Sequence, residues 1–370
     1  MVKEINRYLI KCFLTKLAIV IGGFSILFFI INMIEIVERL SGSTIAIDII
    51  FILSWLKIPS HLSSIIVTSV LIAAIWSFYQ MSMRSEIVII RGCGFSIWQI
   101  SWQMQVCAFI FGIFWLIIFN QIEIWSQKKY NEIESQNIEI EKREFIEAQS
   151  GVWFRQKNLD DKAEDIIISV RKIYKNSTYF ADASIWFFDK TNIFYKRIDA
   201  KKLKLIKEKW ILNDVVINDQ TLINQHQDFM QIPSDLSEDF IKKKIINNYD
   251  SGQFYSIFEL PNVIKEMENS GLSSKKFKIY FHGQLVQPFL FAAMVMFAGF
   301  FGISSHRNIY AQIKIFIGII FGLLVFLASS IILKFGSAGL ISIFEATWLV
   351  GVIYISLGLL LIYRKENINT

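Results

Sequence analysis

Uncharged apolar runs alternate with short charged stretches at both ends of the chain. A helix needs about 20 apolar residues, at a rise of about 1.5 Å each, to cross a hydrocarbon layer about 30 Å thick, where it satisfies its own backbone hydrogen bonds. Six runs without Asp, Glu, Lys or Arg reach about this length: 17–34, 60–81, 97–122, 283–303, 315–333 and 346–363. The pattern predicts six transmembrane helices in two groups of three.

The segments beside these runs predict shorter helices. Residues 1–16 form a basic amphipathic lead-in. Residues 45–56 are mostly apolar but too short to cross a membrane, so we expect an interfacial helix there. Pro59 suits the first turn of the next span, and residues 254–270 predict a surface helix that Pro261 interrupts.

The middle of the chain changes from helical to β periodicity. Residues 123–148 continue as a charged helix. Beyond Gly151, stretches rich in Ile, Val, Trp, Phe and Tyr are separated by turn signals at intervals of roughly ten residues, which predicts an all-β sandwich or open barrel. Alternate residues Ile166, Ile168 and Val170 share one face of a strand.

Four aromatic residues are expected to fill the interior of this β domain: Trp153, Trp186, Phe188 and Trp210. Core packing is the ordinary interpretation of such a stripe, and a slot lined for lipid is the sharper alternative. The predicted fold class is an α+β membrane protein. Its predicted parts are a transmembrane half (1–122), a β domain with flanking helices (123–276) and a second transmembrane half (277–370).

Composition and charge agree with a membrane protein and set its orientation. The 370 residues are 54% hydrophobic, with 33 Phe and 10 Trp, and carry a formal net charge of +6. The lysines and arginines are spread along the chain, so no nucleic-acid surface is indicated. Basic residues in short loops mark the cytoplasmic side, which places both termini and residues 84–91 there, and residues 123–276 outside.

Catalytic and metal-binding motifs are absent from the sequence. No Gly-Lys pair occurs that could belong to a phosphate-binding loop, and the four histidines are isolated. The three cysteines form no Cys-x-x-Cys pair, so neither a disulfide framework nor a thiolate metal site is indicated. We expect no enzymatic activity, cofactor or metal in this chain.

The stretch that joins the second and third spans is short and charged. Arg84, Glu86 and Arg91 lie together at one membrane surface, and Gly94 provides a turn. On a helix, Glu86 and Arg91 are about 500° apart and therefore point to adjacent sides. Such a segment is either an ordinary polar turn or a short helix with a carboxylate for docking another protein.

Several motifs resemble the lipopolysaccharide export permeases, LptF and LptG. They are Arg84-Ser85-Glu86-Ile-Val, Gly94-Phe-Ser, Gly151-Val-Trp at the start of the β domain, and Gln284 to Pro288 in the fourth span. The order of spans and β domain agrees over the whole chain, and Gly151-Val-Trp favours the LptG member.

The resemblance implies a multi-pass permease in the bacterial inner membrane with a periplasmic, jelly-roll-like β domain. Its partners would be a cytoplasmic LptB-like ATPase dimer, a second LptF-like permease, an LptC-like bridge protein and lipopolysaccharide itself. The ATPase would bind the hinge of Arg84, Ser85, Glu86, Arg91 and Gly94. The substrate path would include Glu35 and the aromatic residues of the β domain.

Glu35 departs from the family pattern. Some members carry a lysine there that meets lipid phosphate, and a carboxylate would repel phosphate, so direct lipid binding at Glu35 is in question. Two other functions stay open. A lipoprotein or peptide export permease usually has four spans rather than six, and a membrane-anchored binding module without transport leaves Glu86 without a role.

Overall fold

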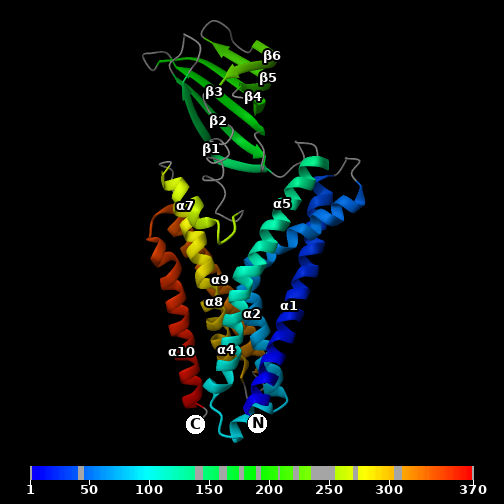
Figure 1. Cartoon of the computed structure of the whole chain (residues 1–370), viewed down its shortest axis with the longest axis vertical. Helices are drawn as coiled ribbons and strands as arrows, with labels where there is room; N and C mark the ends of the chain where they lie inside the picture. Colours follow the sequence, from blue (N-terminus) through cyan, green and yellow to red (C-terminus); the bar gives the residue numbers. More distant parts are fainter. Residues whose placement is uncertain are drawn as a thin grey trace. The chain divides into compact units, whose positions relative to one another are not determined.

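A computed structural model gives the fold of the chain (Figure 1). It describes residues 2–40, 46–137, 145–157, 165–174, 179–188, 193–206, 209–219, 225–234, 255–269, 274–303 and 311–368. The chain divides into two compact units. Met1–Tyr130 and Gly252–Thr370 form a helical unit, and Asn131–Ser251 form a β unit.

The helical unit contains the membrane-spanning part of the chain. Its elements are α1 (Val2–Arg39), α2 (Ile47–Met83), α3 (Glu86–Gly92), α4 (Ile97–Phe114), the π-helical turn η1 (Trp115–Phe119), α5 (Asn120–Asn137), α7 (Leu260–Asn269), α8 (Lys275–Gly302), α9 (Ala311–Ala338), the π-helical turn η3 (Glu345–Leu349) and α10 (Val350–Ile368). Among the described residues, six helical segments are long and apolar enough to cross a membrane. This confirms the six predicted spans and the α+β membrane class.

The helices are longer than the uncharged runs on which they were predicted. The basic lead-in and the first span form one helix, α1, and the expected interfacial helix at 45–56 is wrong as a separate element because α2 runs unbroken through Pro59. A single missing backbone donor is tolerated in a membrane helix, where neighbouring helices and side chains satisfy the freed carbonyl.

Two further boundaries differ from the sequence-based expectation. The charged helix predicted for 123–148 is wrong at its end, because α5 ends at Asn137 and β1 has already begun at Phe145. Pro261 does not interrupt a helix, since it is the second residue of α7, where its missing N–H would have had no intrahelical partner.

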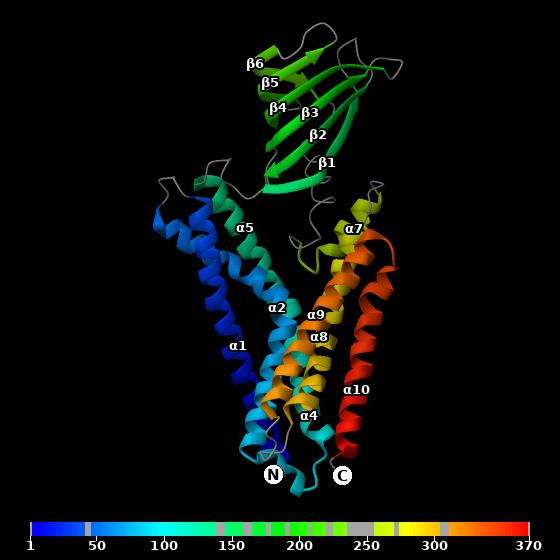
Figure 2. The same ribbon diagram turned by 180° about the vertical axis from the view of Figure 1, so that it is seen from behind.

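Helix α8 lies at the centre of the helical unit. It contacts α2, α4, α9 and α10, while α2 also contacts α1 and α9. Figure 2 shows α8 and α9 beside α2 and α4, with the two termini at the same end of this unit. Close helix approach depends on small residues: a Cβ at Gly112 of α4 would lie 2.6 Å from the Cα of Pro288 in α8.

The β unit is one antiparallel sheet in which each strand pairs with the next along the chain. The strands are β1 (Phe145–Lys157), β2 (Asp165–Tyr174), β3 (Tyr179–Phe188), β4 (Phe194–Ile206), β5 (Lys209–Asp219) and β6 (Gln225–Pro233). The described strands thus follow next-neighbour order, and a jelly-roll-like arrangement stays a prediction.

One face of this sheet forms the core of the β unit. Ile166, Ile168 and Val170 are buried on it, as predicted, together with Phe154 and Trp210. The indole N–H of Trp210 donates to Gln156 Oε1 over 2.9 Å, so its polar atom is satisfied inside the core.

The expectation that four aromatic residues fill this interior is wrong for three of them. Trp210 is fully buried, but the side chain of Trp153 is 51% exposed. Trp186 and Phe188 alternate with the buried Ile185 and Phe187 along β3 and therefore lie on the opposite face. Trp153 stacks on Trp186 there, with ring centroids 5.2 Å apart.

Candidate coupling site

Helix α3 is a short separate helix because left-handed backbone precedes and follows it. Ser85 before it has φ 60°, and Gly94 after it has φ 90°. Glycine adopts this conformation freely, whereas serine rarely does. The Ser85 N–H still donates to the Ser82 carbonyl over 3.0 Å, so the turn out of α2 keeps its backbone hydrogen bond.

The two faces of α3 differ in burial. Ile87 and Ile90 are buried and join the main core of the helical unit. Val88 and Ile89 are each 65% exposed, and Cys93 just beyond the helix is exposed as well. Exposed aliphatic side chains at the tip of a short helix form a surface suited to docking another protein.

Glu86 is the charged residue at the start of this helix, and Tyr8 of α1 contacts it. The Tyr8 hydroxyl donates to Glu86 Oε2 over 2.9 Å, across a sequence separation of 78 residues. Arg84 lies 3.9 Å from Glu86 Oε1 at its nearest nitrogen, a long ion pair with an exposed cation. Helix α1 thereby orients the carboxylate, whose side chain is 25% exposed, while the Arg84 side chain beside it is 60% exposed.

The next helix is joined to the end of the chain. Ser96 and Gln99 form a reciprocal capping box at the start of α4. Glu366 near the end of α10 accepts a hydrogen bond from the backbone N–H of Ile97 over 2.8 Å, where a carboxylate also complements the helix dipole. This links α10 to the segment that follows α3.

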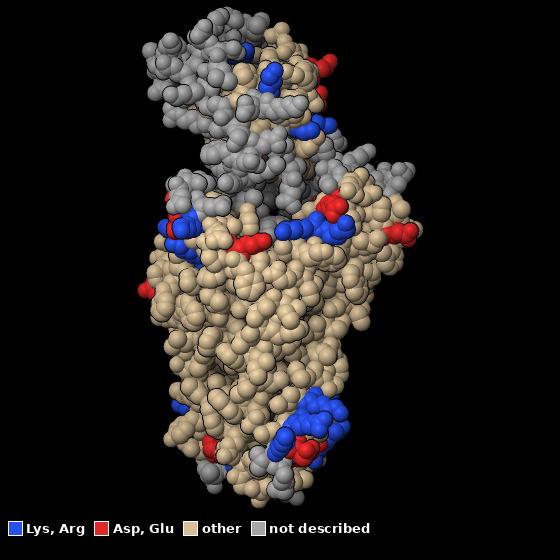
Figure 3. Space-filling view, in the orientation of Figure 1, with Lys and Arg blue, Asp and Glu red and all other residues tan. Residues whose placement is uncertain are grey.

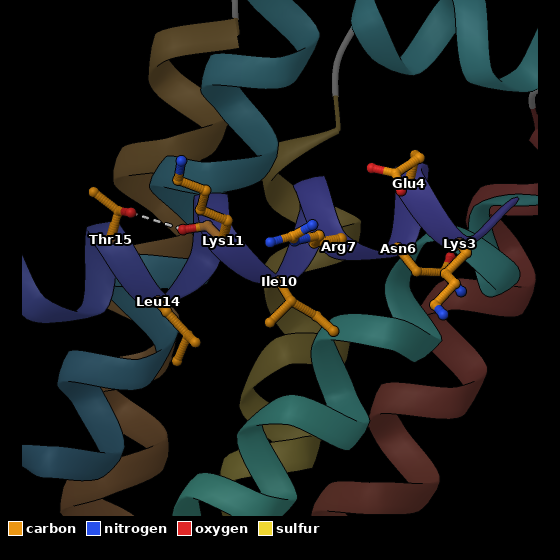
Figure 4. Close-up of a pocket in the computed structure, with 8 residues that line it drawn as sticks. All are labelled: Lys3, Glu4, Asn6, Arg7, Ile10, Lys11, Leu14 and Thr15. Atoms are coloured by element: carbon orange, nitrogen blue, oxygen red, sulfur yellow. Dashed lines mark hydrogen bonds between the residues drawn. The ribbon is translucent and has the colours of Figure 1, made fainter. Parts of the chain in front are cut away.

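The first turns of α1 add a basic surface at the same end of the helical unit. A shallow hollow there is lined by residues of α1 alone: Lys3, Glu4, Asn6, Arg7, Ile10, Lys11, Leu14 and Thr15 (Figure 4). Figure 4 shows Lys11 and Glu4 on one side of α1 and Ile10 and Leu14 on the other. Basic side chains interspersed with apolar ones are typical of a helix end at a membrane surface.

At the opposite end of α1, polar side chains join it to its neighbours. Lys57 of α2 donates to Glu35 Oε1 over 2.9 Å, and Asn32 donates to the Ser54 carbonyl over 3.3 Å. Arg39 Nη2 donates to the hydroxyl of the buried Tyr130 of α5 over 2.9 Å. Helix α1 therefore has polar contacts near both ends.

Between those ends, α1 exposes apolar side chains, and so does α9. In the most apolar 18-residue segment of α1, and in that of α9, only 17% of the residues are buried. The corresponding share is 56% in α2 and 61% in α8. Figure 3 shows an uncharged band across the visible face of the helical unit, with Lys, Arg, Asp and Glu gathered above and below it. Both helices thus offer surfaces to lipid or to another membrane protein.

Comparison with known proteins identifies the family. The model of the family described as "Lipopolysaccharide export system permease LptF/LptG" matches residues 7–364. The chain belongs to the LptF/LptG family. It is also similar to the lipopolysaccharide export system permease protein LptG of Haemophilus influenzae, with 21% identity over 344 residues that cover 90% of each chain.

An LptF/LptG permease is a component of the lipopolysaccharide export system. In this family member the structure brings the predicted hinge residues together at one end of the helical unit: Arg84, Ser85, Glu86, Arg91 and Gly94. The predicted path residues belong to both units: Glu35 lies in α1, and the four aromatic residues lie on two faces of the sheet.

Sequence reasoning missed two partners of these residues, Tyr8 and Lys57, and also the contact between Arg39 and Tyr130. Lys57 carried a signal, since it is a lone cation that ends an apolar run and would face Glu35 if the first two helices form a hairpin. Tyr8 and Tyr130 carried none, because a tyrosine near a membrane surface is common in any span.

Proposed function

We propose that the chain is the permease subunit of an ATP-driven exporter that extracts lipopolysaccharide from the inner membrane and delivers it to a periplasmic bridge. The observation that carries the proposal is α3: a short helix with an oriented carboxylate at Glu86 beside the exposed aliphatic residues Val88 and Ile89. An ordinary polar turn requires neither an oriented carboxylate nor exposed aliphatic side chains.

The orientation follows from the distribution of basic residues. Lys3, Arg7 and Lys11 of α1 and Arg84 beside α3 lie at the end of the helical unit that holds both termini. Short basic segments stay on the cytoplasmic side, so α3 and both termini face the cytoplasm and the β unit faces the periplasm.

A separate cytoplasmic ATPase supplies the work. The sequence has no phosphate-binding loop, whereas removing a lipid with several acyl chains costs about 0.8 kcal/mol for every CH₂ that leaves the bilayer. An LptB-like ATPase dimer would dock on α3, with one subunit on this chain and the other on a second permease.

The second permease and the substrate use the exposed helices. The apolar stripes of α1 and α9 are largely unburied within this chain, as expected if they border a lateral entrance shared with an LptF-like partner. The apolar interior of the β unit, with Trp210 and Phe154 buried in it, would have to open to receive acyl chains on their way to an LptC-like bridge protein.

Co-purification tests the docking role of α3. In Glu86→Arg, the reversed charge removes the acceptor for Tyr8 and repels a basic partner, so the ATPase should be lost from the solubilised complex while the chain still inserts. Glu4→Arg, at the same end of α1, is the matched control and should retain the ATPase. Retention of the ATPase by Glu86→Arg would contradict the proposal.

Co-purification combined with a lipopolysaccharide release assay separates the alternatives. A lipoprotein or peptide export permease would retain the ATPase but would release no lipopolysaccharide on ATP addition. A non-transporting binding module would bring down no ATPase in either the wild type or the control variant.

A further inference from the structure

Helix α1 has hydrogen bonds to the coupling helix at one end and to α5 at the other. Near its start, the Tyr8 hydroxyl contacts Glu86 of α3 at 2.9 Å. Near its end, Arg39 contacts the Tyr130 hydroxyl at 2.9 Å. The helix is continuous between them, so the two contacts are about 46 Å apart at a rise of 1.5 Å per residue.

The contact between Arg39 and Tyr130 is important because of where Tyr130 lies in the chain. Tyr130 is the last residue of the helical unit before the chain enters the β unit, and it belongs to α5, which continues to Asn137. A displacement of α1 along its axis therefore acts on the helix from which the β unit begins.

The covalent connections of α3 are poorly suited to carry such a displacement. Left-handed residues lie on both sides of α3, Ser85 toward α2 and Gly94 toward α4. A change of dihedral angles at these positions lets α3 turn without moving the adjoining helices by the same amount. The side-chain bond from Glu86 to Tyr8 bypasses both.

Helix α1 is packed along one side and exposed along the other. Leu9, Phe13 and Leu17 are buried in the same core as Ile87 and Ile90 of α3. The middle of α1 packs on α2, where the ring of Phe28 stacks on that of His61. Its opposite side exposes Ile26, Ile30 and Ile34, so a displacement of α1 would carry the adjoining part of α2 with it. Coupling between distant sites needs a contiguous chain of contacts of this kind.

We infer that α1 is a rigid link between the coupling helix and α5, with Tyr8 and Arg39–Tyr130 as its positioning contacts. The inference rests on the proposed function, because it names the helix through which a displacement of α3 by an ATPase would be transmitted. A parallel route through α2 exists, since Ser63 donates to Glu123 of α5 over 2.5 Å. Cutting the α1 route therefore weakens transport without abolishing it.

The test is a double-mutant cycle in the complete exporter, reconstituted with its ATPase and partner permease in lipopolysaccharide-containing vesicles. Tyr8→Phe and Tyr130→Phe each remove one hydroxyl and keep the ring. Each should lower the lipopolysaccharide released per ATP hydrolysed about fivefold, the factor that one hydrogen bond of ordinary net strength contributes. ATPase co-purification and ATP hydrolysis should stay at wild-type levels in Tyr130→Phe, whose substitution lies about 46 Å along α1 from the Glu86 contact.

The double variant distinguishes two contacts that act in series from two that act independently. Two contacts in series on one link give the same loss together as either gives alone, whereas independent contacts multiply to about 25-fold. Arg39→Gln should reproduce Tyr130→Phe if the phenylalanine variant is poorly inserted. Tyr363→Phe, an exposed tyrosine of α10 at the same end as Tyr8, is the control and should behave as wild type.

The outcomes separate this inference from the proposed function. A multiplicative loss, or wild-type coupling in both single variants, would overturn the role of α1 while leaving ATPase docking on α3 intact. Retention of the ATPase by Glu86→Arg would instead remove the proposed function from which the inference starts.

Discussion

The ammonium group of Lys57 lies 2.9 Å from Glu35 Oε1, so this carboxylate is neutralised by a cation on the adjacent helix. The Lys57 side chain is 17% exposed and that of Glu35 is 50% exposed. The ion pair places a cation near the end of α1, but the carboxylate already neutralises its charge, so it attracts a phosphate ligand less strongly.

Removing the carboxylate should make that cation available. In Glu35→Gln, Lys57 loses its counter-ion, and capture of phosphorylated lipopolysaccharide by a photoreactive group near position 57 should rise about two- to fivefold, the range that a partly exposed ion pair accounts for. The double variant Glu35→Gln with Lys57→Gln should return to the wild-type level. An equal rise in the double variant would show that Lys57 is not the cause.

The two faces of the sheet should differ in their contact with substrate. A photoreactive amino acid at Trp210, on the buried face, should capture lipopolysaccharide while ATP is hydrolysed. The same residue at Trp186, on the opposite face, is the matched control and should capture little. Stronger capture at Trp186 would mean that the substrate follows the outer face of the sheet.

Substitutions on the two faces should differ in their effect on the stability of the β unit. Trp210→Ala leaves a cavity beside Phe154 and Phe180 and should destabilise the β unit by about 3–5 kcal/mol. Trp153→Ala removes an exposed ring stacked on Trp186 and should cost about 1 kcal/mol or less. Hydrogen exchange of residues 165–219 in the full-length solubilised chain measures both, and comparable protection in the two variants would contradict the assigned burial.

The close approach of α4 and α8 should make glycine substitutions position-dependent. Gly112→Ala places a methyl group against the backbone of Pro288 and should destabilise the helical unit by about 1–3 kcal/mol. Gly22→Ala in α1, where a Cβ would meet nothing within 4 Å, should be neutral or raise stability by up to about 1 kcal/mol through helix propensity. Thermal unfolding of the solubilised chain compares them, and an equal effect at both positions would contradict the packing described.

Hydrophobic pattern was sufficient for the elements whose signal is local. The six uncharged runs became six spanning helices, and residues 165–174 became β2 with Ile166, Ile168 and Val170 on its buried face. Strand β6 carries little local signal, because its sequence, Gln225 to Pro233, is mostly polar and its burial is slight. A strand of that kind is recognised only by the neighbour with which it pairs.

Contacts between distant segments could not be predicted in the same way. Whether Trp186 or Phe187 faces the core depends on strand register, and a shift of one residue exchanges the two faces. Asp182 and Asp214 adopt left-handed backbone inside strands, and the alternation of buried residues changes phase beside them, from Phe180 to Ala183 and from Leu212 to Val215. Tyr8 and Glu86 meet only because α1 packs beside the α2–α3 turn, which no local pattern encodes.

In the proposed function, the ATPase displaces α3 on the cytoplasmic side, and the β unit binds lipid on the periplasmic side. Residue-specific labelling of cells with an intact inner membrane tests this arrangement most directly. Cys93 beside α3 is exposed, and Lys201 of β4 is an exposed site for a second cysteine. With Cys12 and Cys107 replaced by alanine, a membrane-impermeant maleimide should label Lys201→Cys before lysis and Cys93 only after it. Labelling of Cys93 in unlysed cells, or protection of position 201 until lysis, would contradict the account.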